Sequence, residues 1–480
     1  MRREDRLRGL VQLAVIAGGP RLQCIGLPDH VVPDSASRGL DARSTVDPDS
    51  ALVMADSARE AQFLVGTIPG SVSVAWVIWP PGRSMPVIEA AQRAGLRPLA
   101  RFGVVGDPSS PNHLVRLGTP SSRRWFADSV RPAWGMRSRV ARTAGKLPVV
   151  APWGFGGQAL LMTGRTSPRA WPLAPEDGHG IPATIALGGG TTAGRSVLTY
   201  TDGQGRPVRH VKVEPCDVGM SVLRPMSEDR ALEVVGRLAP LRGSVPTLLG
   251  KVQEADWRAF AQSHLPGVVL ERRWEARHRT RDWEHDVSHV VDWLCRMSSA
   301  SAGLSDAAIP KERRTADLPS GLPPELRAAI SRGHCLARTT SRMVHGDLWP
   351  ANVVRGPSTI GVLDWESAAL GHPLMDALSF LVTATRHRFR GRATLAEACR
   401  AALTGEFAGM SERWLRQVLT SVGMPDACRS GLQDLVLSQL VELALRPAPA
   451  GGADAERMQD WMACVYATWD GWGAERDSHS

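Results

Sequence analysis

The segment MVHGDLWPANVV, at 343–354, combines an acid and an amide with two residues that break regular structure. Asp347 lies between Gly346 and Pro350, so we expect it on a loop. A carboxylate on such a loop could accept a hydrogen bond from a substrate hydroxyl and orient it. Asn352 follows five positions later. Its amide oxygen could bind magnesium beside carboxylates without adding negative charge.

A second acid follows the next apolar run. Asp364 ends the run TIGVLD, and a short hairpin would return it to the side of Asn352. Oxygen ligands from these two residues, completed by phosphate oxygens, form a site that magnesium accepts. Glu366 could add a further ligand, or be a charge at the rim or the partner of an arginine. For His345 we expect a structural role, packed under the loop and bonded to backbone.

Transfer of a phosphoryl group also needs a cation and backbone N–H groups near the phosphates. Lys212 lies between Val211 and Val213 on a predicted strand, where it could point into a cleft and meet the α- and β-phosphates, or face solvent. A glycine-rich stretch one hairpin earlier would let backbone approach phosphate closely, although a loose turn is the other interpretation. Its glycines are Gly188, Gly189, Gly190 and Gly194.

The elements that must position these residues come in a consistent order. Residues 184–187, 196–201 and 208–213 alternate apolar and polar, which predicts a meander of three antiparallel strands. A helix is expected within 224–240, because Leu232, Val235 and Leu238 share one face. Two further strands follow, and from about Trp283 the pattern is mostly helical.

The chain from about 183 to 475 resembles the aminoglycoside phosphotransferase and choline kinase family, which has the protein-kinase-like fold. HGDLWPANVV, followed by IGVLDWESAALGHPLMDAL, is similar to its catalytic loop and metal-binding segment. The resemblance implies an α+β bilobal fold, with a small antiparallel-sheet N-lobe at 183–265 and a helical C-lobe at 266–480. It also implies ATP and Mg²⁺ as cofactors.

The resemblance further implies roles for single residues. Asp347 would be the catalytic base or hydroxyl-orienting group, with Asn352 and Asp364 holding magnesium. Lys212 would contact the nucleotide phosphates, and Asp376 would bond the catalytic loop.

The residues that would contact adenine and pair with the lysine are less clearly marked in this sequence. The backbone from Gln262 to His264 would bond adenine. A helical glutamate pairs with the strand lysine in this family, and the sequence offers Glu228 and Glu233. We prefer Glu228, which shares a face with Leu232 and Val235; the other interpretation is that both are surface charges.

The first region, 1–165, alternates short strands and helices and predicts an α/β domain of unknown role. Residues 50–110 weakly resemble a degenerate class I methyltransferase fold, but AGGP at 17–20 is a poor substitute for its glycine-rich turn. The segment 121–147 is basic with two tryptophans and could bind an anionic partner, although a solvated basic segment explains it as well. Residues 166–182, rich in proline and glycine, are expected to be a linker.

Composition limits the remaining classes. A chain of 480 residues suggests two or three domains. The net charge of +9 suits an acidic ligand such as a nucleotide, or a merely arginine-rich surface. An odd count of 7 cysteines without a CxxC pair argues against a disulfide framework or zinc site, so we expect a cytoplasmic protein. The apolar run at 10–18 is a poor signal peptide, and no run approaches the ~20 apolar residues of a membrane span.

We therefore expect an ATP- and magnesium-dependent phosphotransferase that acts on a small-molecule hydroxyl. The acceptor could be a sugar, an amino alcohol, an aminoglycoside or a biosynthetic intermediate; the absence of a strongly acidic C-terminal stretch argues mildly against a polycation. One alternative is a non-catalytic, kinase-like scaffold. Another, resting on charge alone, is a nucleic-acid-binding protein. We do not expect nucleic acid or membrane as partners, and the oligomeric state is open.

Overall fold

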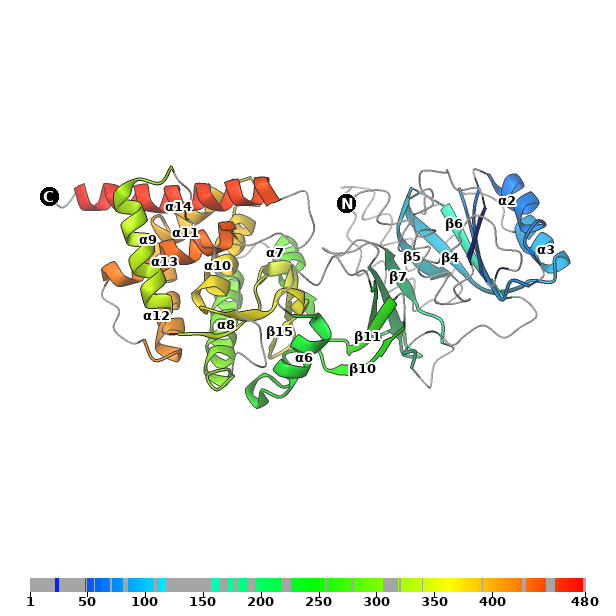
Figure 1. The fold of residues 1–480 in the computed structure, drawn as a ribbon, viewed down its shortest axis with the longest axis horizontal. Coiled ribbons are helices and arrows are strands. Elements are labelled where there is room, and N and C mark those ends of the chain that lie inside the picture. Colours follow the sequence, from blue (N-terminus) through cyan, green and yellow to red (C-terminus); the bar gives the residue numbers. More distant parts are fainter. Residues whose placement is uncertain are drawn as a thin grey trace. The chain divides into compact units, whose positions relative to one another are not determined.

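The structure is a computed structural model, drawn in Figure 1. It describes residues 22–25, 48, 50–55, 57–69, 71–80, 85–107, 110–117, 157–163, 171, 173–175, 180–187, 195–216, 226–254, 257–277, 280–304, 318, 321–338, 340–390, 392–424, 429–445 and 454–477. The four glycines proposed to approach phosphate lie outside this part, as do the segment 121–147 and the N-terminal 20 residues.

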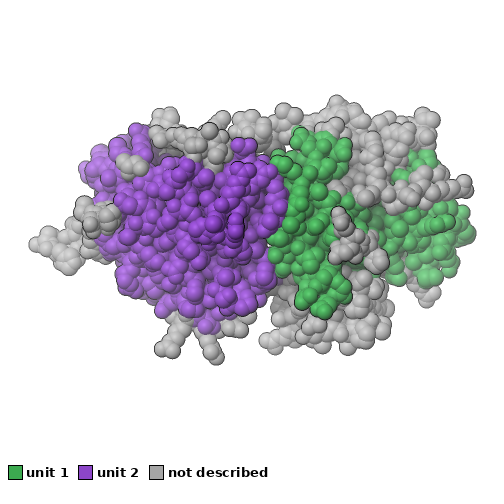
Figure 2. Space-filling model, turned by 90° about the horizontal axis from the view of Figure 1, so that it is seen from below, with its two compact units in different colours: residues 1–218, 249–264 green, residues 219–248, 265–480 purple. Residues whose placement is uncertain are grey.

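The chain divides into two compact units, coloured separately in Figure 2. Unit 1 comprises residues 1–218 and 249–264, and unit 2 comprises residues 219–248 and 265–480. The described elements are mixed α and β, with most of the helices in unit 2. Each unit is described by itself.

Unit 1 contains one continuous sheet, in which the described strands have the order β1-β2-β3-β6-β4-β5-β7-β8-β9-β11-β10. β1, β2 and β3 run parallel to one another, and each neighbouring pair from β3 along the sheet to β11 is antiparallel. The strands are β1 (Leu22–Ile25), β2 (Ser50–Met54), β3 (Val74–Trp79), β4 (Arg97–Asp107), β5 (Ser110–Leu117), β6 (Gly157–Thr163), β7 (Thr184–Leu187), β8 (Ser196–Thr201), β9 (Pro207–Pro215), β10 (Leu248–Gln253) and β11 (Trp257–Ser263).

β2, from Ala51 on, and β3 are buried on both faces, which explains their uninterrupted apolar runs. Along β3, Trp76 and Ile78 enter a core that continues to β11, while Val77 and Trp79 enter a second core. The helices α2 (Ala58–Val65) and α3 (Met85–Arg93) supply the other wall of that second core. The strand–helix–strand order predicted for this region is therefore confirmed.

The predicted meander is also confirmed, as β7, β8 and β9 with β11 beyond it. It joins the preceding strands through β5, where Leu114 pairs with Ile185. The first core is shared across this junction, since Phe102 of β4 and Val211 of β9 belong to the same apolar cluster. The 166–182 stretch predicted as a linker thus lies between strands of one sheet.

Unit 2 is mainly helical. Its longer described helices are α6 (Glu228–Gly236), α7 (Leu270–Arg277), α8 (Thr280–Ala300), α9 (Pro324–Ala337), α10 (Leu374–Arg388), α11 (Leu395–Leu403), α12 (Ala408–Ser421), α13 (Arg429–Leu445) and α14 (Asp454–Asp477). Helix α9 packs closely on α13: a Cβ at Gly333 would lie 2.0 Å from the Asp434 carbonyl oxygen. No helix in the described ranges combines the length and apolarity needed to cross a bilayer.

Short strands in unit 2 hold the loops that carry the predicted site. β14 (Val353–Arg355) and β15 (Ile360–Val362) form a hairpin, and β12 (Val268–Val269) pairs with β14. β13 (Arg342–Val344) pairs with β16 (Ala369–Gly371). After the two residues of β12 the chain turns directly into α7.

Candidate active site

The loop after β13 is shaped by two local features. Gly346 has a φ of 81°, which an L side chain rarely adopts, so the chain can turn sharply just before Asp347. A short 3-10 helix (Pro350–Asn352) then leads directly into β14. Asp347 is half-buried on this loop, as its flanking glycine and proline indicated.

Asp376, near the start of α10, fixes the backbone of this loop. Its two carboxylate oxygens accept hydrogen bonds from the backbone N–H groups of His345 (2.6 Å) and Gly346 (2.8 Å). Asp376 is buried, so these charge-assisted bonds are shielded from water. The prediction that Asp376 bonds the catalytic loop is confirmed.

His345 is fully buried and connects the loop to the neighbouring hairpin. Its Nε2 lies 2.8 Å from the carbonyl oxygen of Leu363, and the backbone N–H of Asp347 donates to its Nδ1 at 3.2 Å. The ring therefore takes Nδ1 as acceptor and Nε2 as donor. This is the structural role predicted for His345.

Asn352 is hydrogen-bonded both to Asp347 and to the backbone just before Asp364. Its Nδ2 donates to the carbonyl oxygen of Asp347 (2.9 Å) and to that residue's Oδ2 (3.3 Å). Because Nδ2 faces Asp347, Oδ1 is the amide atom suited to a cation. The backbone N–H of Leu363 donates to the Asn352 carbonyl oxygen at 2.9 Å, which places Asp364 beside this residue across the hairpin.

Asp364 itself has a left-handed backbone, with φ 62° and ψ 66°. This conformation costs a residue other than glycine on the order of 1 kcal/mol, so the surrounding contacts must impose it. It directs the chain from β15 into a short 3-10 helix (Trp365–Ser367).

Three carboxylates gather where this turn meets α6. Oxygens of Glu228, Asp364 and Glu366 all lie within 4.8 Å of one another. Glu228 and Glu366 are buried, and Glu228 begins a helix whose N-terminal dipole favours negative charge. Such carboxylates need positive charge nearby, and hard oxygen donors with the Asn352 amide are a set that fits magnesium.

The predicted nucleotide-binding residues of unit 1 lie on β9 and β11. Lys212 is buried and pairs with Phe260 across the two strands. Gln262 is also buried. The backbone N–H of His264 donates to the Val208 carbonyl oxygen at 3.1 Å, so an adenine contact at this residue would use its carbonyl group.

A chain of polar side chains runs beside these residues. His210 Nδ1 lies 3.1 Å from Thr199 Oγ1, and His210 Nε2 lies 3.0 Å from His264 Nδ1. Burial, followed by the charges of His264 and Lys212, lowers the pKa of His210 to about 3. His210 is therefore neutral at pH 7.

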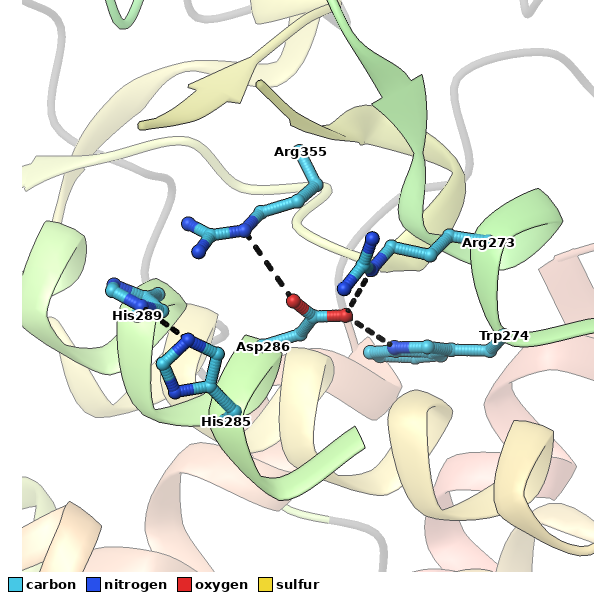
Figure 3. Close-up of polar contacts among 6 residues, drawn as sticks. All are labelled: Arg273, Trp274, His285, Asp286, His289 and Arg355. Atoms are coloured by element: carbon cyan, nitrogen blue, oxygen red, sulfur yellow. Dashed lines mark hydrogen bonds and ion pairs between the residues drawn. The ribbon is translucent and has the colours of Figure 1, made fainter. Parts of the chain in front are cut away.

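Asp286 on α8 is a buried acid that the sequence did not single out. Its Oδ2 accepts hydrogen bonds from Arg273 Nε (2.7 Å) and Trp274 Nε1 (3.1 Å), and its Oδ1 lies 3.5 Å from Arg355 Nε (Figure 3). Arg355 ends the β14 strand that starts after Asn352. No short motif marks Asp286, because its partners come from two other segments, α7 and β14.

A comparison with protein-family models matches residues 223–413 to the phosphotransferase enzyme family, APH. We call residues 223–413 the APH segment; they make up less than half of the chain. The APH segment contains Glu228, His264, Asp347, Asn352, Asp364 and Asp376. Lys212 lies outside it. No curated protein sequence matches the chain.

Solved structures of kinases are similar to this chain at low identity. An aminoglycoside phosphotransferase, APH(3'')-Id of Streptomyces rimosus, is 16% identical; the match covers 58% of this chain and 90% of that one, with a TM-score of 0.31. Amicoumacin kinase hAmiN, with AMP-PNP and Ca²⁺, is 12% identical; the match covers 57% of this chain and 86% of that one, with a TM-score of 0.35. A thermostable APH(4)-Ia mutant with ADP and hygromycin B is 15% identical; the match covers 57% of this chain and 90% of that one, with a TM-score of 0.33.

Proposed function

We propose that this protein transfers the terminal phosphate of ATP to a hydroxyl group of a small molecule, with magnesium as cofactor. Two observations together carry the proposal: the hydrogen bond from Asn352 to Asp347, and the hairpin that brings Asp364 alongside Asn352. They join, inside the APH segment, a carboxylate able to orient a hydroxyl and oxygen donors able to hold a divalent cation.

In this mechanism Asp347 accepts a hydrogen bond from the acceptor hydroxyl and takes its proton as the hydroxyl oxygen bonds to the γ-phosphorus. The bond from that phosphorus to the bridging oxygen breaks in the same step, and ADP leaves. Asn352 keeps the Asp347 carboxylate in place through Nδ2 and would bind the metal through Oδ1. Asp364 would be the second protein ligand, and Glu366 could add a third. Magnesium, when bound, supplies positive charge that offsets the charge on the phosphates.

Under the same proposal the fold has two kinase-like lobes, with the β7–β11 strands as the smaller and unit 2 as the larger. Lys212 would contact the α- and β-phosphates, aided by backbone at Gly188, Gly189, Gly190 and Gly194. The Gln262–His264 backbone would bond adenine. Glu228 would pair with Lys212 or, through its neighbours Asp364 and Glu366, help to hold a cation.

The acceptor is proposed only as a class, an alcohol-bearing small molecule. We propose a screen of sugars, amino alcohols, aminoglycosides and other hydroxylated metabolites for ATP consumption by the purified protein.

Substitutions in the loop test the proposed roles. We expect Asp347→Ala to lower kcat by about 10²–10⁴-fold, the usual contribution of a positioned acid or base, while ATP affinity stays within about twofold. Asp364→Ala should weaken magnesium-dependent ATP binding as well. Wild-type turnover in both variants would show that the wrong loop had been chosen.

A matched control separates chemistry from folding. Glu412→Gln changes an acid on the surface of α12 that pairs with Arg416 four residues on, and it should leave kcat and ATP affinity unchanged. A scaffold without catalysis would show no turnover with any acceptor, and lack of magnesium-dependent ATP binding would favour it. Binding to nucleic acid that weakens steeply with salt would favour the remaining alternative.

A further inference from the structure

Two histidines on the N-terminal half of α8 face each other. His285 and His289 lie four residues apart, so their side chains project from successive turns on one face of the helix. Their Nε2 atoms are 3.0 Å apart, and the rings meet edge to face with centroids 4.3 Å apart (Figure 3). His285 is exposed and His289 is half-buried, so water and small ions can reach the pair.

The spacing of the two nitrogens matches that of neighbouring ligands on one metal ion. Two imidazole nitrogens bound at about 2.0–2.1 Å are ~2.9 Å apart when the angle at the metal is a right angle and ~3.3 Å apart in a tetrahedron. The observed 3.0 Å lies near the first value. It therefore suits square-planar or octahedral coordination, which Cu²⁺ and Ni²⁺ favour.

The protonation state of the pair also suits a metal. A contact between two Nε2 atoms needs one N–H donor and one lone pair, so the two rings cannot both be charged there. Burial, then the positive charges of Arg355 and His285, lowers the pKa of His289, although Asp292 and Asp286 act in the opposite direction. A neutral imidazole is the form that binds metals.

We propose that His285 and His289 form a two-histidine site for a divalent transition metal, with Cu²⁺ bound most tightly and water completing the coordination. The metal takes the place of the proton between the two Nε2 atoms, and the ring that donated it carries its proton on Nδ1 instead, so both Nε2 lone pairs face the metal. The site differs in chemistry from the oxygen-donor set at Asn352 and Asp364. Nitrogen donors select transition metals over Mg²⁺, so the two sites do not compete for one ion.

The test is a Cu²⁺ titration of the full-length protein, followed by electron paramagnetic resonance and calorimetry. It uses a Cys335→Ser background, because Cys335 is an exposed thiol that could bind the metal by itself. We expect a signal from nitrogen ligands, and either His285→Ala or His289→Ala should weaken this binding by about tenfold or more. Millimolar magnesium should not displace the copper.

His334→Ala is the matched control, since His334 lies on another helix of the same unit and pairs with Glu442 at 3.1 Å. It should leave copper binding unchanged. Both histidine variants place alanine, a strong helix former, at an exposed or a half-buried position of α8, so circular dichroism should show the wild-type fold. Copper binding that is equal in the wild type and in both variants, or a signal without nitrogen ligands, would overturn the proposal.

Discussion

The position of Asp347 is fixed by other residues rather than by its own rotamer. Asp376 holds the backbone on the N-terminal side of Asp347, and Asn352 holds the carboxylate itself. Under the proposed function, a small shift of this carboxylate would misplace the acceptor hydroxyl, and such a shift can cost about 10²-fold in rate. Residues that never touch a substrate therefore contribute to the site.

Asp376→Asn tests this support. An amide has one acceptor oxygen, so its NH₂ group would face one of the two backbone N–H donors of His345 and Gly346. We expect a loss of about 2–4 kcal/mol of stability, as a buried charge-assisted hydrogen bond is lost and a donor is left unsatisfied. kcat should fall more than the KM for ATP changes. Urea unfolding and steady-state kinetics measure these effects.

Glu412→Gln again serves as the control, because the Glu412–Arg416 pair lies on a helix surface and is worth at most about 0.5 kcal/mol. If Asp376→Asn were as stable and active as this control, the loop would not depend on Asp376.

At this scale the loop at 343–354 predicted the structural role of His345, and the family resemblance implied that Asp376 bonds this loop. It did not predict the approach of Glu228 to Asp364 and Glu366. That cluster joins residues more than a hundred positions apart, and nothing local to α6 indicates which carboxylates it will meet. The buried Asp286 was missed for the same reason.

Among the elements, the β14–β15 hairpin is anchored through its first strand to the helices behind it. Asp286 accepts hydrogen bonds from Arg273 and Trp274 of α7 and forms an ion pair with Arg355 of β14. Asp286→Asn removes the negative charge that faces the two arginines and leaves them poorly compensated. We expect a loss of about 3–5 kcal/mol and weaker magnesium-dependent ATP binding, since the hairpin carries Asn352 and Asp364 near its ends.

The matched control is Asp292→Asn, the same change six positions along the same helix. Asp292 is exposed and its Oδ1 accepts a hydrogen bond from Gln417, which an asparagine oxygen could still accept. Thermal unfolding should show a large drop in Tm for the first variant and little for the second. Equal values for the two would mean that the Asp286 network does not anchor the hairpin.

Element prediction worked where the pattern is strong and local. The meander, α6 and the long helices α8, α9, α10, α13 and α14 all follow from periodicity. Helix α11 also has a local signal, because Thr394 and Glu397 form a capping box that marks its start. β6 lies between β3 and β4 in the sheet, and nothing within its own residues indicates partners so far away along the chain.

For the whole molecule, each unit contains a buried histidine whose pKa is lowered: His210 in unit 1 and His372 in unit 2. Burial, helped by the charge of Arg342, lowers the pKa of His372 from 6.5 to about 4. Below pH 6.5 the unfolded chain takes up a proton at this residue and the folded chain does not. Stability therefore falls as the pH drops from 6.5 towards 4 and is unaffected by this group above 6.5.

His372→Asn isolates this contribution. The asparagine oxygen can replace Nδ1 as acceptor for the backbone N–H of Leu374, which lies 3.3 Å away in the wild type. We expect the variant to be less stable at pH 7.5, but its stability relative to the wild type should rise by about 1.4 kcal/mol per pH unit below 6.5, or on the order of 3 kcal/mol by pH 4. Urea unfolding at several pH values gives this difference, in which contributions from other groups such as His210 cancel. A difference that stays constant from pH 7.5 to pH 4 would mean that His372 is protonated equally in the folded and unfolded chains.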